Sequence, residues 1–278
     1  MWSSLTLLLL LAAGCADSSV TKLTSRTEPQ LADDEAGRIV RRAIEAGGGW
    51  EMWRQHRDAE FVATLTILTP GAEVVSETIF LHKILLHEPG VRVDSIGLIE
   101  EVIFGFDGGR EWMLRGGRAV TSVAGTAFTR FHAMADALWF GLPFVLAERP
   151  VELSYLGSES GDGRQWERVR AGLSDAAIPA DWMVLYFDVE TGLVDQIHAH
   201  VNAEFLAHSL WVGRMRDYRT VGGLRKERRR LFYPADPEGK IIGPLAAEEI
   251  VEHVRFDNGW ARDLFSAPLA AGGGSPAG

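Results

Sequence analysis

The chain has 278 residues, 46% of them hydrophobic, and a formal net charge of -10. A chain of this length and composition can bury a substantial core, whereas its negative charge opposes nonspecific binding to nucleic acid or to an anionic membrane surface. Cys15 is the only cysteine, so no internal disulfide is available and packing must hold the fold. We therefore expect a globular protein that does not bind nucleic acid.

The N-terminal segment contains an apolar run from Leu5 to Ala13. It has the length of a signal peptide and is well short of the roughly 20 residues that a membrane-spanning helix requires. The residues AAGC that end at Cys15 resemble a bacterial lipobox, in which the cysteine is acylated and becomes the first mature residue. We expect a signal peptide at residues 1–14, a lipidated Cys15, a flexible tether over residues 15–31, and a location at the outer membrane facing the periplasm.

Residues 32–268 are expected to form one domain that begins with helices and continues with strands, followed by a disordered tail at residues 269–278. In ADDEAGRIVRRAIEA the apolar residues share one side at helical spacing, which predicts a helix that Gly47–Gly49 ends, and WEMWRQH predicts a second short one. The short connections that follow favour an antiparallel meander. The predicted strands are 61–67, 74–86, 91–95, 101–106, 111–114, 119–123, 151–155, 165–170, 183–188, 194–203, 212–218, 231–233 and 251–256.

One apolar stretch, TAFTRFHAMADALWFGLPFVLA at residues 126–147, interrupts the strands. Its apolar residues recur at spacings of three and four, which predicts a helix with an aromatic face that Gly141 and Pro143 break or kink. This helix either completes the core on one face of the sheet or covers an apolar cavity for a lipid-like ligand. The expected ligand-binding residues are Phe128, Phe131, Trp139, Phe140 and Phe144, with Trp50, Trp53 and Trp112 as further candidates.

Several motifs occur in a familiar order: GGGWEMWRQHRDAEF, FDGGREWML, ALWFGLPFVLAERPVELSYLG, LYFDVETGLVDQI and VEHVRFDNGWARDLFSAP. Over residues 32–268 this order resembles the superfamily of outer-membrane lipoprotein carriers and receptors, the LolA/LolB-like proteins. The resemblance implies a mainly β (α+β) fold: an unclosed antiparallel β-barrel, or strongly curved sheet, capped by helices around a cavity that takes acyl chains. A sorting role does not follow from the fold alone.

Motifs for catalysis are not found in the sequence. GSESG at residues 157–161 has Glu159 where a nucleophile elbow has serine, and Gly239-Lys240 lacks the upstream glycine of a Walker A loop. We therefore expect no catalytic residue, no enzyme activity and no cofactor.

The strand QIHAHVNAE places His198, His200, Asn202 and Glu204 on one face. With a third ligand from another strand, such as His208 or His253, His198 and His200 are the candidates for binding a divalent metal. The alternative, and our expectation, is a strand whose polar side faces water and binds no metal.

The basic run RKERRR at residues 225–230 contrasts with the acidic composition. It is predicted to be a solvated strand edge, where charge blocks edge-to-edge pairing. The alternative is a contact with anionic groups near the membrane.

Together these features predict a lipid-anchored cell-envelope protein that binds an acyl chain or lipid moiety under a helical lid, in lipid or lipoprotein handling. The membrane is contacted through the anchor, and an envelope protein is an additional expected partner. Two alternatives stay open: an anchored interaction or sensor protein without a small-molecule ligand, and a metal-dependent envelope enzyme built around His198 and His200.

Overall fold

The computed structural model describes residues 29–148, 151–173, 180–201 and 209–268. The signal peptide, the lipidated Cys15, most of the tether and the tail at residues 269–278 therefore lie outside the described residues. Among the helices in the described ranges, none is both long enough and apolar enough to cross a membrane.

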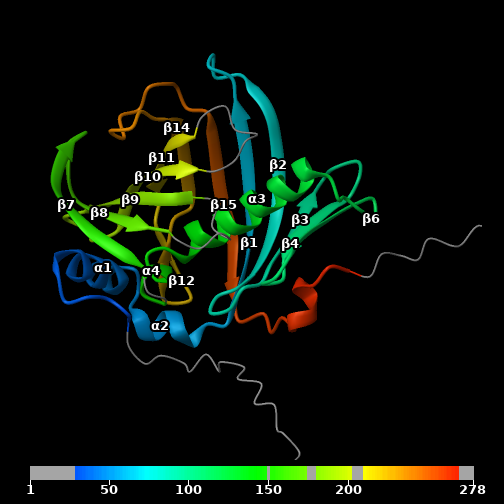
Figure 1. Cartoon of the computed structure of the whole chain (residues 1–278), viewed down its shortest axis with the longest axis horizontal. Helices are drawn as coiled ribbons and strands as arrows, with labels where there is room; N and C mark the ends of the chain where they lie inside the picture. The colour runs from blue at the N-terminus through cyan, green and yellow to red at the C-terminus, as the bar shows by residue number, and fades with distance from the viewer. Residues whose placement is uncertain (1–28, 149–150, 174–179, 202–208, 269–278) are drawn as a thin grey trace, which may run out of the picture.

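The central feature is one antiparallel sheet of thirteen described strands, in the order β6-β5-β4-β3-β2-β1-β15-β14-β11-β10-β9-β8-β7 (Figure 1). Its edges, β6 and β7, do not pair with each other, so the sheet is open. The mainly β, unclosed antiparallel architecture predicted from the sequence is confirmed. The strands are β1 (Asp58–Leu68), β2 (Val74–Leu85), β3 (Val91–Ile96), β4 (Val102–Phe106), β5 (Glu111–Arg115), β6 (Arg118–Ala119), β7 (Glu152–Gly161), β8 (Arg164–Gly172), β9 (Ala180–Asp188), β10 (Val194–Val201), β11 (Leu210–Arg216), β14 (Arg229–Pro234) and β15 (Ala247–Phe256).

Each predicted strand corresponds to one strand of this sheet, although β6 is much shorter than the predicted 119–123. The reason is that the Ser122 side chain accepts a hydrogen bond from the Gly125 backbone N–H and so begins the next helix. A small hairpin, β12 (Arg219–Val221) and β13 (Leu224–Lys226), was not expected from the sequence. Its strands are too short for alternation to indicate them.

Two N-terminal helices, α1 (Glu35–Ala46) and α2 (Trp50–Gln55), precede β1 as predicted. The Asp34 carboxylate caps α1 by accepting from the Gly37 N–H, and the apolar side of α1 packs on β7 and β8. Between the helices, Gly48 has φ 120° and a Cβ there would lie 2.3 Å from the carbonyl oxygen of Gly223. Only glycine fits this close approach of two backbones.

The long helix α3 (Val123–Gly141) crosses the concave face of the sheet and packs against β3, β4 and β5 (Figure 1). It ends at Gly141, as predicted, because Leu142 has an extended backbone and Pro143 follows it. A short helix, α4 (Val145–Glu148), then leads toward β7. The position of α3 creates the space in which a ligand site can form.

The C-terminal motif FDNGW closes the chain back onto β1. The Asp58 carboxylate, at the start of β1, accepts hydrogen bonds from the backbone N–H groups of Asn258 at 2.8 Å, Gly259 at 3.0 Å and Trp260 at 3.2 Å. The 3-10 helix η1 (Arg262–Phe265) follows, and Phe265 is fully buried. These bonds hold the last strand, β15, beside the first.

Candidate ligand-binding cavity

A cavity of about 800 Å³ lies between α3 and the concave face of the sheet. This volume is within the ~300–1,000 Å³ typical of small-molecule sites, which are concave and mostly apolar. The side chains come from both halves of the sheet because α3 lies across it. Apolar wall residues on the strands include Leu65, Ile67, Phe80, Ile197, Ala199, Val201, Trp211, Met215 and Phe232.

Three of the five aromatic residues predicted to bind ligand lie on the cavity wall: Phe128, Phe131 and Trp139. All three are on α3 and half-buried, and Phe128 meets Phe104 of β4 edge-on with ring centroids 5.6 Å apart. Their spacing along the helix directs them to the side that faces the sheet. Their contact with a ligand stays a prediction.

The structure places the other two, Phe140 and Phe144, in the packed core and not on the cavity wall. Phe140 stacks on Phe61 and Phe144 stacks on Trp53, each with ring centroids 4.7 Å apart. The break after Gly141 turns Phe144 away from the helix axis that carries Trp139. The further candidates Trp50, Trp53 and Trp112 are likewise buried outside the wall.

A group of buried charges adjoins the cavity. Arg230 of β14 is fully buried; its guanidinium donates to Glu227 at 2.6 Å and to Glu249 of β15 at 2.9 Å. Although burial opposes the charged form, Glu249 and Glu227 raise the pKa of Arg230 above its usual value. Glu249 lines the cavity, so this ion-pair network reaches the wall.

The basic run at residues 225–230 is therefore not a solvated strand edge, and that prediction is wrong. β14 lies inside the sheet between β11 and β15, and the side chains of Lys226 and Arg230 are fully buried. Lys226 donates to the carbonyl oxygen of Phe140 near the C-terminal end of α3, and burial lowers its pKa to about 8. Two acidic partners make the burial of Arg230 possible: Glu227, which belongs to the run itself, and Glu249, 19 residues further along the chain. The run alone does not reveal the pairing with Glu249.

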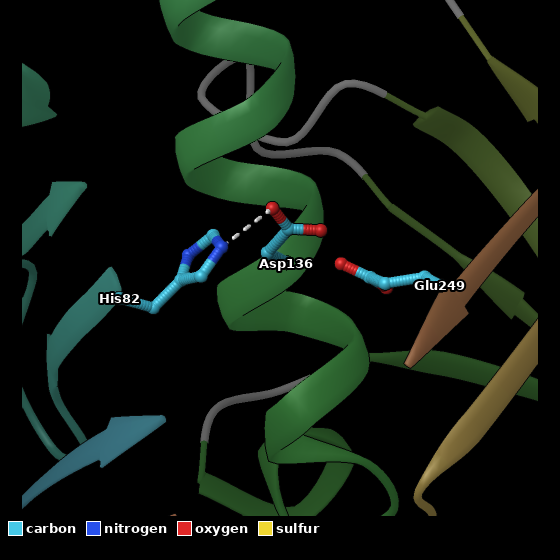
Figure 2. Close-up of side chains that lie close together, drawn as sticks. All are labelled: His82, Asp136 and Glu249. Atoms are coloured by element: carbon cyan, nitrogen blue, oxygen red, sulfur yellow. Dashed lines mark ion pairs between the residues drawn. The ribbon is translucent and has the colours of Figure 1, made fainter. Parts of the chain in front are cut away.

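Next to this network are His82 of β2 and Asp136 of α3 (Figure 2). His82 Nε2 lies 3.5 Å from an Asp136 carboxylate oxygen, and both nitrogens of the fully buried ring lack a hydrogen-bond partner. Burial lowers the pKa of His82 to about 3, and burial together with Glu249 raises the pKa of Asp136 well above its usual range. Burial also lowers the pKa of His132, on the cavity wall, to about 4.

Sequence reasoning missed this polar group, although the pattern contained a signal for it. His82 alternates with the buried Phe80 and Ile84, and Asp136 follows His132 by four residues on the side of α3 that faces the sheet. A polar residue on an otherwise apolar face is informative because its burial must be offset by a partner.

The metal candidates predicted from the sequence are on β10, on the face opposite Ala199. His198 is buried against Trp182, with ring centroids 5.0 Å apart, and the half-exposed His200 lies 3.0 Å from an Asp181 oxygen. The proposed third ligand His208, and also Asn202 and Glu204, lie outside the described residues. Within the described ranges, the only group of three or more His, Cys, Asp and Glu side chains close enough to share a metal ion consists of His82, Asp136 and Glu249.

No family model and no curated protein sequence matches the chain. Solved structures do share its architecture. An outer membrane lipoprotein-sorting protein domain from Vibrio parahaemolyticus is 12% identical, with a TM-score of 0.53 over 82% of this chain and 94% of that chain. A LolA superfamily protein from Nitrosomonas europaea is 11% identical, with a TM-score of 0.54 over 84% of this chain and 97% of that one.

A DUF1329 family protein from Desulfovibrio piger gives the same TM-score, 0.54, at 11% identity, over 84% of this chain and 98% of its own. Each of these proteins is aligned over nearly its whole length, so the likeness covers the complete fold and not one motif. At this level of identity the comparison concerns the backbone and leaves the binding function open. The chain therefore has the LolA-like fold.

Proposed function

We propose that this protein binds an apolar ligand, an acyl chain or lipid moiety, in the cavity under α3 and does so without catalysis. The observation that carries the proposal is the cavity of about 800 Å³, whose wall is built from aliphatic and aromatic side chains on α3 and on both halves of the sheet. Burial of apolar surface would drive binding by about 25 cal/mol per Å² before ordering costs. A shared fold with a lipoprotein-sorting domain supports the proposal.

The same proposal places the protein in the cell envelope, attached through a lipidated Cys15 to the outer membrane and facing the periplasm. In that position the domain formed by residues 32–268 would bind a lipid, or the acyl chains of a lipoprotein, and would either hold this ligand or transfer it. Labelling cells with a clickable fatty acid tests the attachment. The wild-type protein is expected to carry the label, and a Cys15→Ser variant is expected to lose it.

The binding test begins with the Cys15→Ser full chain, which carries no lipid anchor, purified without detergent and examined by native mass spectrometry and lipid extraction. A fluorescent fatty acid then serves as probe for a cavity-filling variant, Ala199→Phe, since Ala199 is buried on the wall. We expect at least about a tenfold loss of affinity, or about 1.4 kcal/mol. The matched control is His200→Phe, which adds the same ring on the opposite face of β10 and should bind the probe normally.

An empty protein that also fails to bind the probe would contradict the proposal, as would unchanged binding by Ala199→Phe. The anchored interaction protein would then be favoured. This alternative is supported by exposed aliphatic side chains that a protein partner could cover. They are Val74, Val75, Ile99 and Val123, which are close in sequence to the cavity-wall residues Ser76, Leu98 and Ala124.

A further inference from the structure

The polar group beside the cavity contains three metal-ligand side chains from three separate elements. His82 comes from β2, Asp136 from α3 and Glu249 from β15, and Figure 2 shows the imidazole and the two carboxyl groups pointing toward one another. One potential ligand atom from each lies within 4.8 Å of the other two. Asp136 follows His82 by 54 positions and Glu249 follows Asp136 by 113 positions, so the fold brings together side chains that are far apart in the chain.

The environment of His82 independently points to a ligand at this position. Its ring is fully buried, stacks on Phe61 at 4.6 Å between ring centroids, and makes no hydrogen bond through either nitrogen. Leaving a buried polar group without a hydrogen bond is unfavourable. Packing, not hydrogen bonding, therefore orients Nε2 toward Asp136, and a bound cation would give this nitrogen a partner.

The three ligand atoms lie within 4.8 Å of one another, and one of their separations matches that around a small divalent ion. Two ligands at about 2.1 Å from zinc in a tetrahedron lie about 3.4 Å apart, and His82 Nε2 is 3.5 Å from Asp136 Oδ2. Imidazole nitrogen with carboxylate oxygens is a ligand set that suits zinc better than calcium or magnesium. Arg230 holds one oxygen of Glu249 at 2.9 Å, which is the supporting contact that ligating carboxylates commonly have.

Within this buried group, one carboxyl group is left over after the ion pairs have formed. Three carboxyl groups, Asp136, Glu227 and Glu249, are grouped with two cationic side chains, Arg230 and Lys226, and Arg230 already bridges Glu227 and Glu249. In the part of the chain that the structure describes, no lysine or arginine donates a hydrogen bond to Asp136. Access is available, because Asp136 and Glu249 both line the cavity.

We propose that His82, Asp136 and Glu249 bind one divalent transition-metal ion, with Zn²⁺ as the best match, in the inner wall of the cavity. The metal would tie α3 to β2 and β15, so that binding stabilises the helix in its place over the sheet. Three protein ligands leave a fourth coordination position, which a polar group of a cavity ligand or water would fill. The site is independent of the fatty-acid proposal, because metal binding is measured without any lipid.

The test is a titration of the purified, chelator-treated full chain with ZnCl₂ by calorimetry, with native mass spectrometry for stoichiometry. A Cys15→Ser background removes the only thiol of the sequence. We expect one Zn²⁺ per chain. Affinity should fall more than about 100-fold in His82→Gln and in Asp136→Asn, since loss of a ligand exceeds the 10–100-fold cost of losing a supporting contact. His200→Gln, which removes the exposed histidine of β10, should bind like the parent.

X-ray absorption on the zinc-loaded parent protein gives a result that does not depend on whether a variant folds. One imidazole together with oxygen ligands supports the site. Two or more imidazoles, no binding by the parent, or unchanged affinity in folded His82→Gln and Asp136→Asn would each overturn it. Circular dichroism of each variant without zinc identifies those that are folded.

Discussion

Arg230 shows how this protein tolerates a cation in its interior. It lies directly across the strand pair from Glu249 and three residues after Glu227, so one guanidinium serves two buried carboxylates. Such a network adds little net stability over apolar residues, but removing one member leaves the others uncompensated. The cost of burying Arg230 therefore depends on one partner three residues away and on another 19 residues away.

Replacing Arg230 with methionine should destabilise the protein by about 3–5 kcal/mol, because two buried carboxylates lose their counterion. The neighbouring Arg229→Met is the matched control, since Arg229 pairs with Glu248 at the surface and should cost less than about 1 kcal/mol. Urea unfolding at neutral pH measures both. Equal losses of unfolding free energy in the two variants would show that Arg230 is not coupled to its carboxylates more strongly than Arg229 is to Glu248.

Because Lys226 is buried, we expect the free energy of unfolding to depend on pH. Burial lowers its folded-state pKa from 10.5 to about 8, with Glu227 and Arg230 acting in opposite directions. Between these two values the unfolded chain binds a proton that the folded protein has released, so stability rises with pH, by up to about 1.4 kcal/mol per unit. Below pH 8 both states are protonated and the contribution is constant.

Comparing the unfolding free energies of wild type and Lys226→Met at several values between pH 7 and pH 10 isolates this effect. The difference should shift in favour of the wild type as pH rises above about 8. A pH-independent difference would mean that folding does not lower the pKa of the Lys226 amine.

At the scale of elements, alternation and helical spacing predicted the sheet well because both are local properties. The second half of β2 alternates between buried and half-buried residues, and α3 begins and ends within a few residues of the predicted helix. The pattern also placed Phe128, Phe131 and Trp139 on one side of the helix. It could not place Phe144, because the direction of the chain after Gly141 depends on the tertiary contact with Trp53.

Trp139 and Phe140 are adjacent on α3 and should respond differently to truncation. Phe140→Ala should lose about 3–5 kcal/mol, since a fully buried ring leaves a void against Phe61. Trp139→Ala should lose less than about 2 kcal/mol, because the side chain already borders a cavity. It should instead weaken binding of the fatty-acid probe.

Chemical denaturation and probe titration together measure this pair. A large stability loss in Trp139→Ala with unchanged probe binding would show that the tryptophan is a core residue. Both variants are needed, because a loss of probe binding in one variant alone could result from a loss of stability.

For the whole molecule, the order of strands makes β15 the junction between two halves. β1 to β6 form one side of the sheet, β7 to β11 together with β14 form the other, and β15 pairs with β1 and with β14. Glu249 and Val251, both buried, sit on this strand. Sequence reasoning found the strand but not its central position, because pairing between the first and last strands is a long-range property.

If β15 couples the halves, the described fold should unfold in one cooperative step. Tryptophans report on both sides, with Trp112 on β5 and Trp166 and Trp182 on β8 and β9. Tryptophan fluorescence and far-ultraviolet circular dichroism should therefore give coincident urea transitions. Val251→Ala should shift both by the same amount, about 2 kcal/mol, because it weakens packing at the junction itself. Two separated transitions, or a shift in one probe alone, would instead mean that each half of the sheet is stable without the other. Because both halves of the sheet contribute residues to its wall, the cavity would then be lost as soon as the less stable half unfolds.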